Sequence, residues 1–189
     1  MLASCGQKPD QGEETPGSPT KAPDEAVVGE ALPDWAEGWL DIHAISTGRG
    51  ECTFFMLPDG TSMVIDAGEV VTSSTSPVSV TQRPNSSTRA YFTQARYMKH
   101  FLEATGHNYL DYAVMSHFHI DHFGTPKGKN FIVSSEGYTQ TGLMALYTTL
   151  PYKKLIDRAW SADDPEYEFV KTSAISYNAG MHGDYTNFV

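Results

Sequence analysis

The sequence predicts a mixed α/β fold, and three stretches of the chain support this prediction. Short apolar segments separated by tight turns between residues 40 and 65 predict an antiparallel β-meander. An apolar stripe at helical spacing follows and ends near residue 105. A last apolar run at residues 112–115 leads directly into a cluster of histidines. Together these elements predict two layers, a β-sheet and a covering helix.

The 189 residues divide into a tether, residues 1–38, and one domain, residues 39–189. Residues 6–38 hold eight acidic residues, two lysines and five prolines, and few large apolar side chains. Such a segment buries too little surface to offset the entropy lost on ordering, so it is predicted to be disordered. The remainder is long enough to enclose a proper core.

Composition excludes two broad classes of function. The formal net charge of −10 argues against a nucleic-acid-binding patch built on basic residues. No apolar run approaches the roughly eighteen residues that a membrane-spanning helix requires.

The meander is predicted to begin at residues 40–45, where alternation turns Leu40, Ile42 and Ala44 inward and His43 outward. Residues 52–57 form the second strand, and Pro58-Asp59-Gly60 is a hairpin signal. The third strand, residues 62–65, ends at Asp66-Ala67-Gly68.

Ser86 or Ser87 is predicted to cap a helix that runs to about Thr105, with Gly106 as its stop signal. Its apolar face is formed by Tyr91, Ala95, Met98, Phe101 and Leu102. Beyond the histidine cluster we expect a loop rich in Gly and Ser, a short helix over residues 141–150 and a strand over residues 154–157.

The histidine cluster reads Ser116-His117-Phe118-His119-Ile120-Asp121-His122 and holds three of the seven histidines. Imidazole and carboxylate are ligands that Zn²⁺ prefers, and the end of a buried strand is a rigid position from which to present them. His117 and His119 are two positions apart, so their side chains share one face and can bind one ion. His122 falls outside this alternation and can bind a second, adjacent ion. The alternative is a histidine-rich solvated loop.

The two cysteines have different predicted roles. Cys52 lies in an apolar strand, which predicts a buried free thiol. Cys5 closes Leu2-Ala3-Ser4-Cys5, which resembles the lipobox of bacterial lipoproteins, where a signal peptidase cuts before a cysteine that is then lipidated. This resemblance implies a lipid anchor at Cys5 and no disulfide; the alternative is an ordinary cysteine in a floppy terminus.

The meander ending in Asp66-Ala67-Gly68, the helix and the His117-x-His119-x-Asp121-His122 motif together resemble the metallo-β-lactamase superfamily over residues 39–125. Within this superfamily, the local sequence of these motifs is most similar to the hydrolase domain of bacterial DNA-uptake channel proteins. The resemblance implies an αβ/βα sandwich, in which a second sheet packs on the first, and two Zn²⁺ ions.

In that family, residues at these positions have defined roles. The resemblance implies that His117 and His119 bind the first ion and that Asp121 and His122 bind the second. It also implies that Asp66 supports the metal-binding loops through hydrogen bonds. The family adds a third histidine for each ion downstream. Only His182 remains after His122 here, so we expect the domain to be incomplete at its C-terminus, with His182 as an alternative third ligand.

The resemblance implies a metal-dependent hydrolase in which Asp121 also orients a metal-activated water. The substrate expected is a phosphodiester or another ester or amide, and the chain is expected to be exported and lipid-anchored in a bacterial cell envelope. The rival hypothesis is a non-catalytic envelope lipoprotein that retains a partial metal-binding fold.

Overall fold

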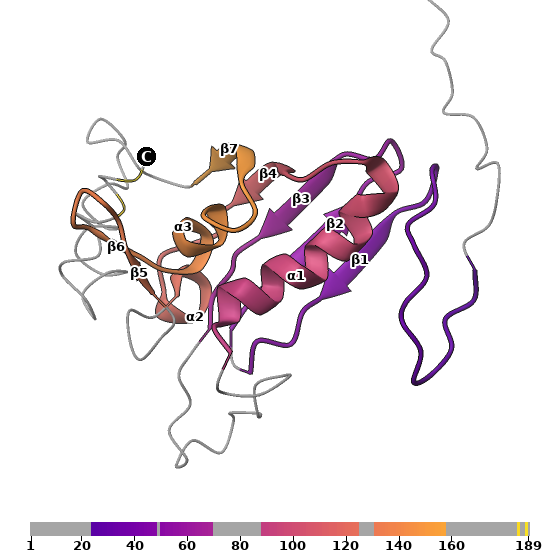
Figure 1. The fold of residues 1–189 in the computed structure, drawn as a ribbon, viewed down its shortest axis with the longest axis horizontal. Helices are drawn as coiled ribbons and strands as arrows, with labels where there is room; N and C mark the ends of the chain where they lie inside the picture. The colour runs from indigo at the N-terminus through magenta and orange to yellow at the C-terminus, as the bar shows by residue number, and fades with distance from the viewer. Residues whose placement is uncertain are drawn as a thin grey trace, which may run out of the picture.

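The computed structural model describes residues 24–48, 50–69, 88–124 and 131–157, together with Tyr185 and Phe188. Five strands form one mixed sheet in the order β1-β2-β3-β4-β7 (Figure 1). Their bounds are β1 Asp41–Ala44, β2 Thr53–Met56, β3 Ser62–Ile65, β4 Leu110–Val114 and β7 Tyr152–Ile156. The first three strands are antiparallel, whereas β4 runs parallel to both β3 and β7. The predicted mixed α/β class and the predicted meander are therefore confirmed.

The hairpin between β2 and β3 forms where its turn residues predict it. Thr61 donates its backbone N–H to the carboxylate of Asp59 at 2.9 Å, and Gly60 takes a φ of +83°. A left-handed conformation of this kind costs glycine nothing, because it has no Cβ. This turn sets the register that places Phe54 opposite Val64 on β2 and β3.

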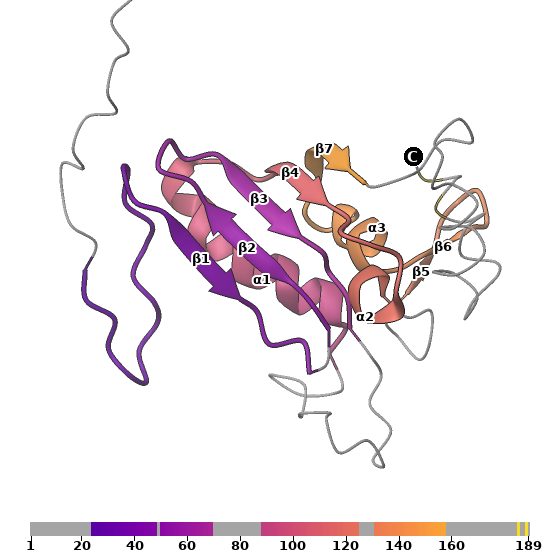
Figure 2. The same cartoon turned by 180° about the vertical axis from the view of Figure 1, so that it is seen from behind.

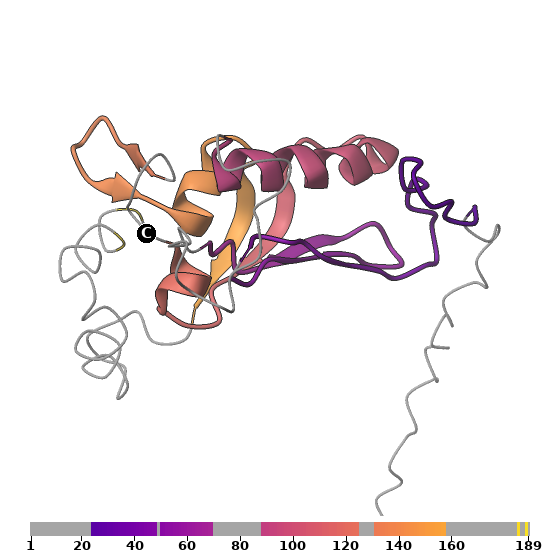
Figure 3. The same ribbon diagram turned by 90° about the horizontal axis from the view of Figure 1, so that it is seen from below.

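Helix α1, Ala90–Leu102, covers one face of the sheet together with the short helix α3, Gly142–Tyr147 (Figure 3). The predicted stripe is confirmed, since the residues buried on α1 are Tyr91, Gln94, Ala95, Met98, Phe101 and Leu102. The N-cap is Arg89, while Ser86 and Ser87 lie outside the described residues. A 3₁₀ turn, η1 (Glu103–Thr105), follows α1, and Gly106 ends it with a φ of +71° as predicted.

The predicted orientation of β1 is wrong. The side chain of His43 is only 9% exposed, and its ring lies 4.2 Å, centroid to centroid, from that of Phe101 on α1. Ile42 points to the other face and is 61% exposed. The register explains this outcome, because His43 pairs with the buried Phe54 and must share the face that α1 covers.

Three short elements downstream were not predicted. Residues Ile120–Phe123 form a helical turn, α2, inside the histidine cluster. The strands β5, Ile132–Val133, and β6, Thr139–Gln140, form a separate hairpin where a loop was expected. The predicted short helix and last strand are present as α3 and β7.

The two faces of the sheet differ in burial. Phe54, Met56, Val64 and Ala113 are fully buried beneath the helices. On the opposite face, Ile42 and Ile156 are 61% and 48% exposed. No helix or strand of the described residues lies over β1, β2 and β3 on that side, as the view from behind shows (Figure 2). We call this surface the open face.

Residues 24–38, assigned above to the tether, contain turns but neither helix nor strand. Trp35 of this segment packs against the core, and Gly38 donates its N–H to the carbonyl of Pro58 at 2.7 Å. Within the part of the chain that the structure describes, no helix is long and apolar enough to cross a membrane.

Candidate metal centre

The histidine cluster lies where β4 leaves the sheet. Met115 continues the parallel pairing by donating its N–H to the carbonyl of Ile156 at 2.7 Å, and its side chain is buried. Phe118 and Phe123 then turn into the core and contact each other and the ring of Tyr185. Because these aromatic rings anchor the loop, the intervening imidazoles are left at its surface.

Backbone contacts fix the far side of the loop. Glu51 donates its N–H to the carbonyl of Asp121 at 2.8 Å and accepts one from Gly68 at 2.9 Å. A Cβ on Gly68 would overlap the Asp121 carbonyl, and one on Gly50 would come within 2.7 Å of the same oxygen. The two glycines therefore permit three chain segments to meet at the site.

Three of the predicted ligands come together. The rings of His117 and His122 are 3.9 Å apart and those of His117 and His119 are 4.7 Å apart, measured between centroids. His119 is exposed, and His117, His122 and Asp121 are partly buried. Asp121 and His122 project from α2, so a helical turn sets the spacing of the second predicted pair.

Asp66 lies directly behind these imidazoles and is 1% exposed. Its carboxylate accepts hydrogen bonds from Nδ1 of His122 at 2.8 Å and from the backbone N–H of Ser116 at 2.8 Å. A proton held on Nδ1 leaves Nε2 of His122 unprotonated and available as a metal ligand. Asp66 therefore lies beside the predicted ligand His122.

Ser116 is a residue of the site that the sequence did not reveal. Its hydroxyl donates to Asp66 and lies 3.0 Å from Nδ1 of His117. It thus connects the buried carboxylate to a second imidazole. The only signal in the sequence is its position between the buried strand and the first histidine.

The electrostatic setting favours the neutral form of His117. Burial lowers the pKa of His117, and the neighbouring His122 and His119 lower it further, against the opposing charges of Asp66 and Asp121. Neutral imidazole is the form that binds a metal ion.

The donor set fits zinc in its chemistry, because the Nδ1 atoms of two imidazoles, those of His117 and His122, have hydrogen-bond partners and a carboxylate is nearby. The side chains as placed do not complete a shell. Over residues 24–157, with the gaps given above, no group of three or more His, Cys, Asp or Glu is arranged to hold a metal ion. The lipidation residue Cys5 and the alternative ligand His182 lie outside the described residues.

Comparisons of this chain with protein-family models, with curated proteins and with solved structures found no match.

Proposed function

We propose that this chain is a metal-dependent hydrolase with a metallo-β-lactamase-like αβ/βα sandwich, exported and held in a bacterial cell envelope by lipid at Cys5. The observation that supports the hydrolase site most directly is the contact between Asp66 and Nδ1 of His122. In zinc sites, a carboxylate often accepts a hydrogen bond from a histidine ligand and thereby fixes the tautomer and the orientation of its ring.

In this proposal His117 and His119 would hold one Zn²⁺ ion, and Asp121 and His122 would hold a second. A pair of bound ions would supply a water of lowered pKa and a positive charge against the developing oxyanion. Asp66 keeps the Nδ1 proton on His122, and Ser116 ties that carboxylate to the loop backbone. The carboxylate of Asp121 orients the attacking water.

The open face supports the sandwich part of the proposal. Phe55, Met63 and Ile65 are only partly buried there, beside the exposed Ile42. A second sheet packed on this surface would remove these side chains from water, which stabilises a domain by about 25 cal/mol per Å² of apolar area.

Phosphodiesters are the proposed substrate class, with other esters and amides as alternatives, because the motif is most similar to that of the DNA-uptake hydrolases. Without a basic patch, an anionic substrate would be attracted by the metal charge. The string Leu2-Ala3-Ser4-Cys5 supports the envelope anchor.

The test is a zinc titration of the full chain by calorimetry, together with turnover of bis(p-nitrophenyl) phosphate. We expect weak zinc binding that is lost in His117→Ala and in His119→Ala. His100→Ala is the matched control, since His100 is exposed near the end of α1 and lies outside the cluster. Equal zinc binding by all four proteins would refute the site. Zinc binding without turnover would favour the rival non-catalytic lipoprotein.

A further inference from the structure

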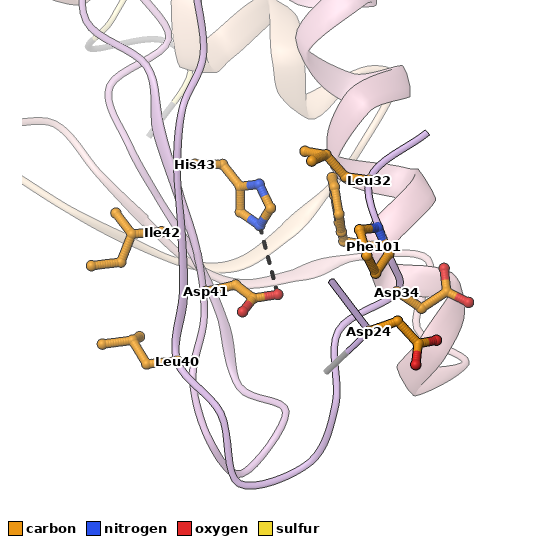
Figure 4. Close-up of a pocket in the computed structure, with 9 residues that line it drawn as sticks. Asp24, Leu32, Asp34, Leu40, Asp41, Ile42, His43 and Phe101 are labelled. Carbon is orange, nitrogen blue, oxygen red and sulfur yellow. Dashed lines mark ion pairs between the residues drawn. The ribbon is translucent and has the colours of Figure 1, made fainter. Parts of the chain in front are cut away.

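A cavity of about 320 Å³ lies beside the first residue of β1 (Figure 4). Strands β1 and β3 run in the same direction, so Asp41 and Asp66 mark opposite ends of the sheet. The cavity is therefore separate from the histidine cluster. Residues 24–34, β1 and the last turn of α1 together form its wall.

The wall combines acid and apolar groups. Asp24, Asp34 and Asp41 line the cavity, and none of its nine described lining residues is lysine or arginine. The remainder is apolar apart from His43, and includes Leu32 and Phe101. Carboxylates beside apolar surface suit a ligand that has both a positive charge and a hydrocarbon part.

His43 provides independent evidence for a ligand. Its side chain is 9% exposed, and its Nε2 atom has no hydrogen-bond partner among the described residues. Nδ1 lies 3.1 Å from the hydroxyl of Tyr97, so that side of the ring is occupied. Nε2 faces the carboxylate of Asp41 at 4.0 Å (Figure 4), which is too long for a hydrogen bond. A buried polar atom of this kind requires a partner.

We propose that this cavity binds a small primary alkylammonium ion, whose nitrogen donates hydrogen bonds to Nε2 of His43 and to the carboxylate of Asp41. One nitrogen placed about 2.9 Å from each atom fits a gap of 4.0 Å between them. The alkyl chain lies against Leu32 and Phe101.

The state of His43 agrees with an acceptor role. Burial lowers the pKa of His43, and the charge of Asp41 opposes this only in part. The lowered pKa favours the neutral ring. In the tautomer whose Nδ1–H is directed at the Tyr97 hydroxyl, Nε2 is an acceptor. A metal ion is a poorer occupant, because the apolar side chains of Leu32 and Phe101 offer it no ligand.

The size of the cavity limits the ligand. A volume of about 320 Å³ is at the small end of ligand pockets, which suits an amine of a few carbons rather than a folded partner. n-Pentylamine is the appropriate probe, and 1-pentanol is its neutral counterpart of similar shape.

The experiment titrates each probe into the full chain and follows the ring protons of His43 by NMR. We expect saturable shifts with n-pentylamine and binding of 1-pentanol at least about tenfold weaker, since a charge-assisted hydrogen bond is lost. Asp41→Asn should weaken amine binding about tenfold, and Asp34→Asn should weaken it less. Glu37→Gln is the matched control, an exposed acid of the same segment outside the cavity.

Equal binding of amine and alcohol would overturn the proposal. The same loss in Glu37→Gln as in Asp41→Asn would also overturn it, because it would indicate general attraction to an acidic protein. Melting temperatures of all variants show whether a loss of binding reflects unfolding. Asp34 is exposed, so its replacement tests the site without disturbing the core.

Discussion

At the scale of single residues, Asp66 combines an unusual backbone conformation with hydrogen bonds from both its backbone and its side chain, and few residue types can provide both. Among the described residues it is the one non-glycine with a positive φ, at +58°. Its N–H also donates to the carbonyl of Val114 at 2.8 Å, while its carboxylate accepts from Ser116 and His122. Asp and Asn tolerate the left-handed region better than other non-glycine residues do, and strain of this kind concentrates at functional sites.

Two substitutions of Asp66 should distinguish the energetic effect of its strained backbone conformation from that of its negative charge. Asp66→Ala should lower the free energy of unfolding by about 2–3 kcal/mol, because it loses the hydrogen bonds and keeps an unfavourable φ. Asp66→Asn should cost about 1 kcal/mol, yet weaken zinc binding about tenfold or more. Urea unfolding and calorimetry measure the two effects. Equal destabilisation by both substitutions would show that the backbone conformation contributes nothing.

The residue scale also shows what the sequence cannot reveal. The proposed ligand types and their order are visible in the motif itself, whereas the role expected for Asp66 rests on a family resemblance. Ser116 could not, because its role depends on a carboxylate 50 positions away in the chain. Cys52 was predicted correctly as a buried thiol, and its burial raises its pKa, as do the charges of Glu51 and Asp66.

At the scale of elements, Gly68 allows the backbone of α2 to lie against the turn that follows β3. Gly68→Ala should destabilise the domain by about 3 kcal/mol or more and abolish zinc binding, since the new methyl group overlaps backbone atoms of Asp121 and His122. Thermal unfolding and the zinc titration check this prediction.

Gly137→Ala is the control for Gly68→Ala. Gly137 has a φ of +90°, but beyond its two chain neighbours no described residue has an atom within 4 Å of the position that an alanine methyl group would take there, so the change introduces strain without a clash. Zinc binding should survive in this variant. Its loss there too would mean that the histidine loop responds to general destabilisation.

Asp111 joins three strands of the sheet. It accepts from the backbone N–H of Ser62 at 2.9 Å and lies 3.0 Å from Nζ of Lys153. Burial raises the pKa of Asp111, but the bonds from Ser62 and Lys153 outweigh it and hold that pKa below its usual value.

A lowered pKa predicts a specific dependence on pH. The stabilisation is present above the unfolded-state pKa of about 3.9 and disappears as the pH falls through the lower pKa of the folded state. Asp111→Asn should therefore cost about 1–3 kcal/mol at pH 7 and progressively less below about pH 4. Urea unfolding at several pH values measures this difference, and a constant difference down to pH 3 would contradict the assignment.

Elements differ in how far the sequence predicts them. The stripe on α1 spans several turns, so its period is unambiguous. In β1, alternation shows that the two faces differ but not which one the helix covers, and His43 was assigned to the wrong face. α2, β5 and β6 have two to four residues each, too few for any periodicity to register.

At the scale of the whole molecule, the open face should determine whether the isolated chain associates and binds hydrophobic dyes. Exposed apolar surface of this kind promotes association and binds hydrophobic dyes. We expect dye fluorescence that falls when Ile42 and Ile156 are both changed to Thr, with the melting temperature little altered because both side chains are already exposed.

Val28→Thr is the matched control, since Val28 is fully exposed and lies in the segment before β1. It should leave the fluorescence unchanged. Absence of dye binding by the unmodified chain would show that the open face is covered in solution.

The parallel pairing of β3 with β4 has a consequence for the order of folding. The hairpins β1–β2 and β2–β3 join neighbours in sequence and close within microseconds. Pairing of Met63 with Tyr112 must instead close a loop of about 50 residues, a slower event. Asp66 and Ser116 meet only at this late step, so the ability to bind zinc should arise after most of the secondary structure has formed during refolding.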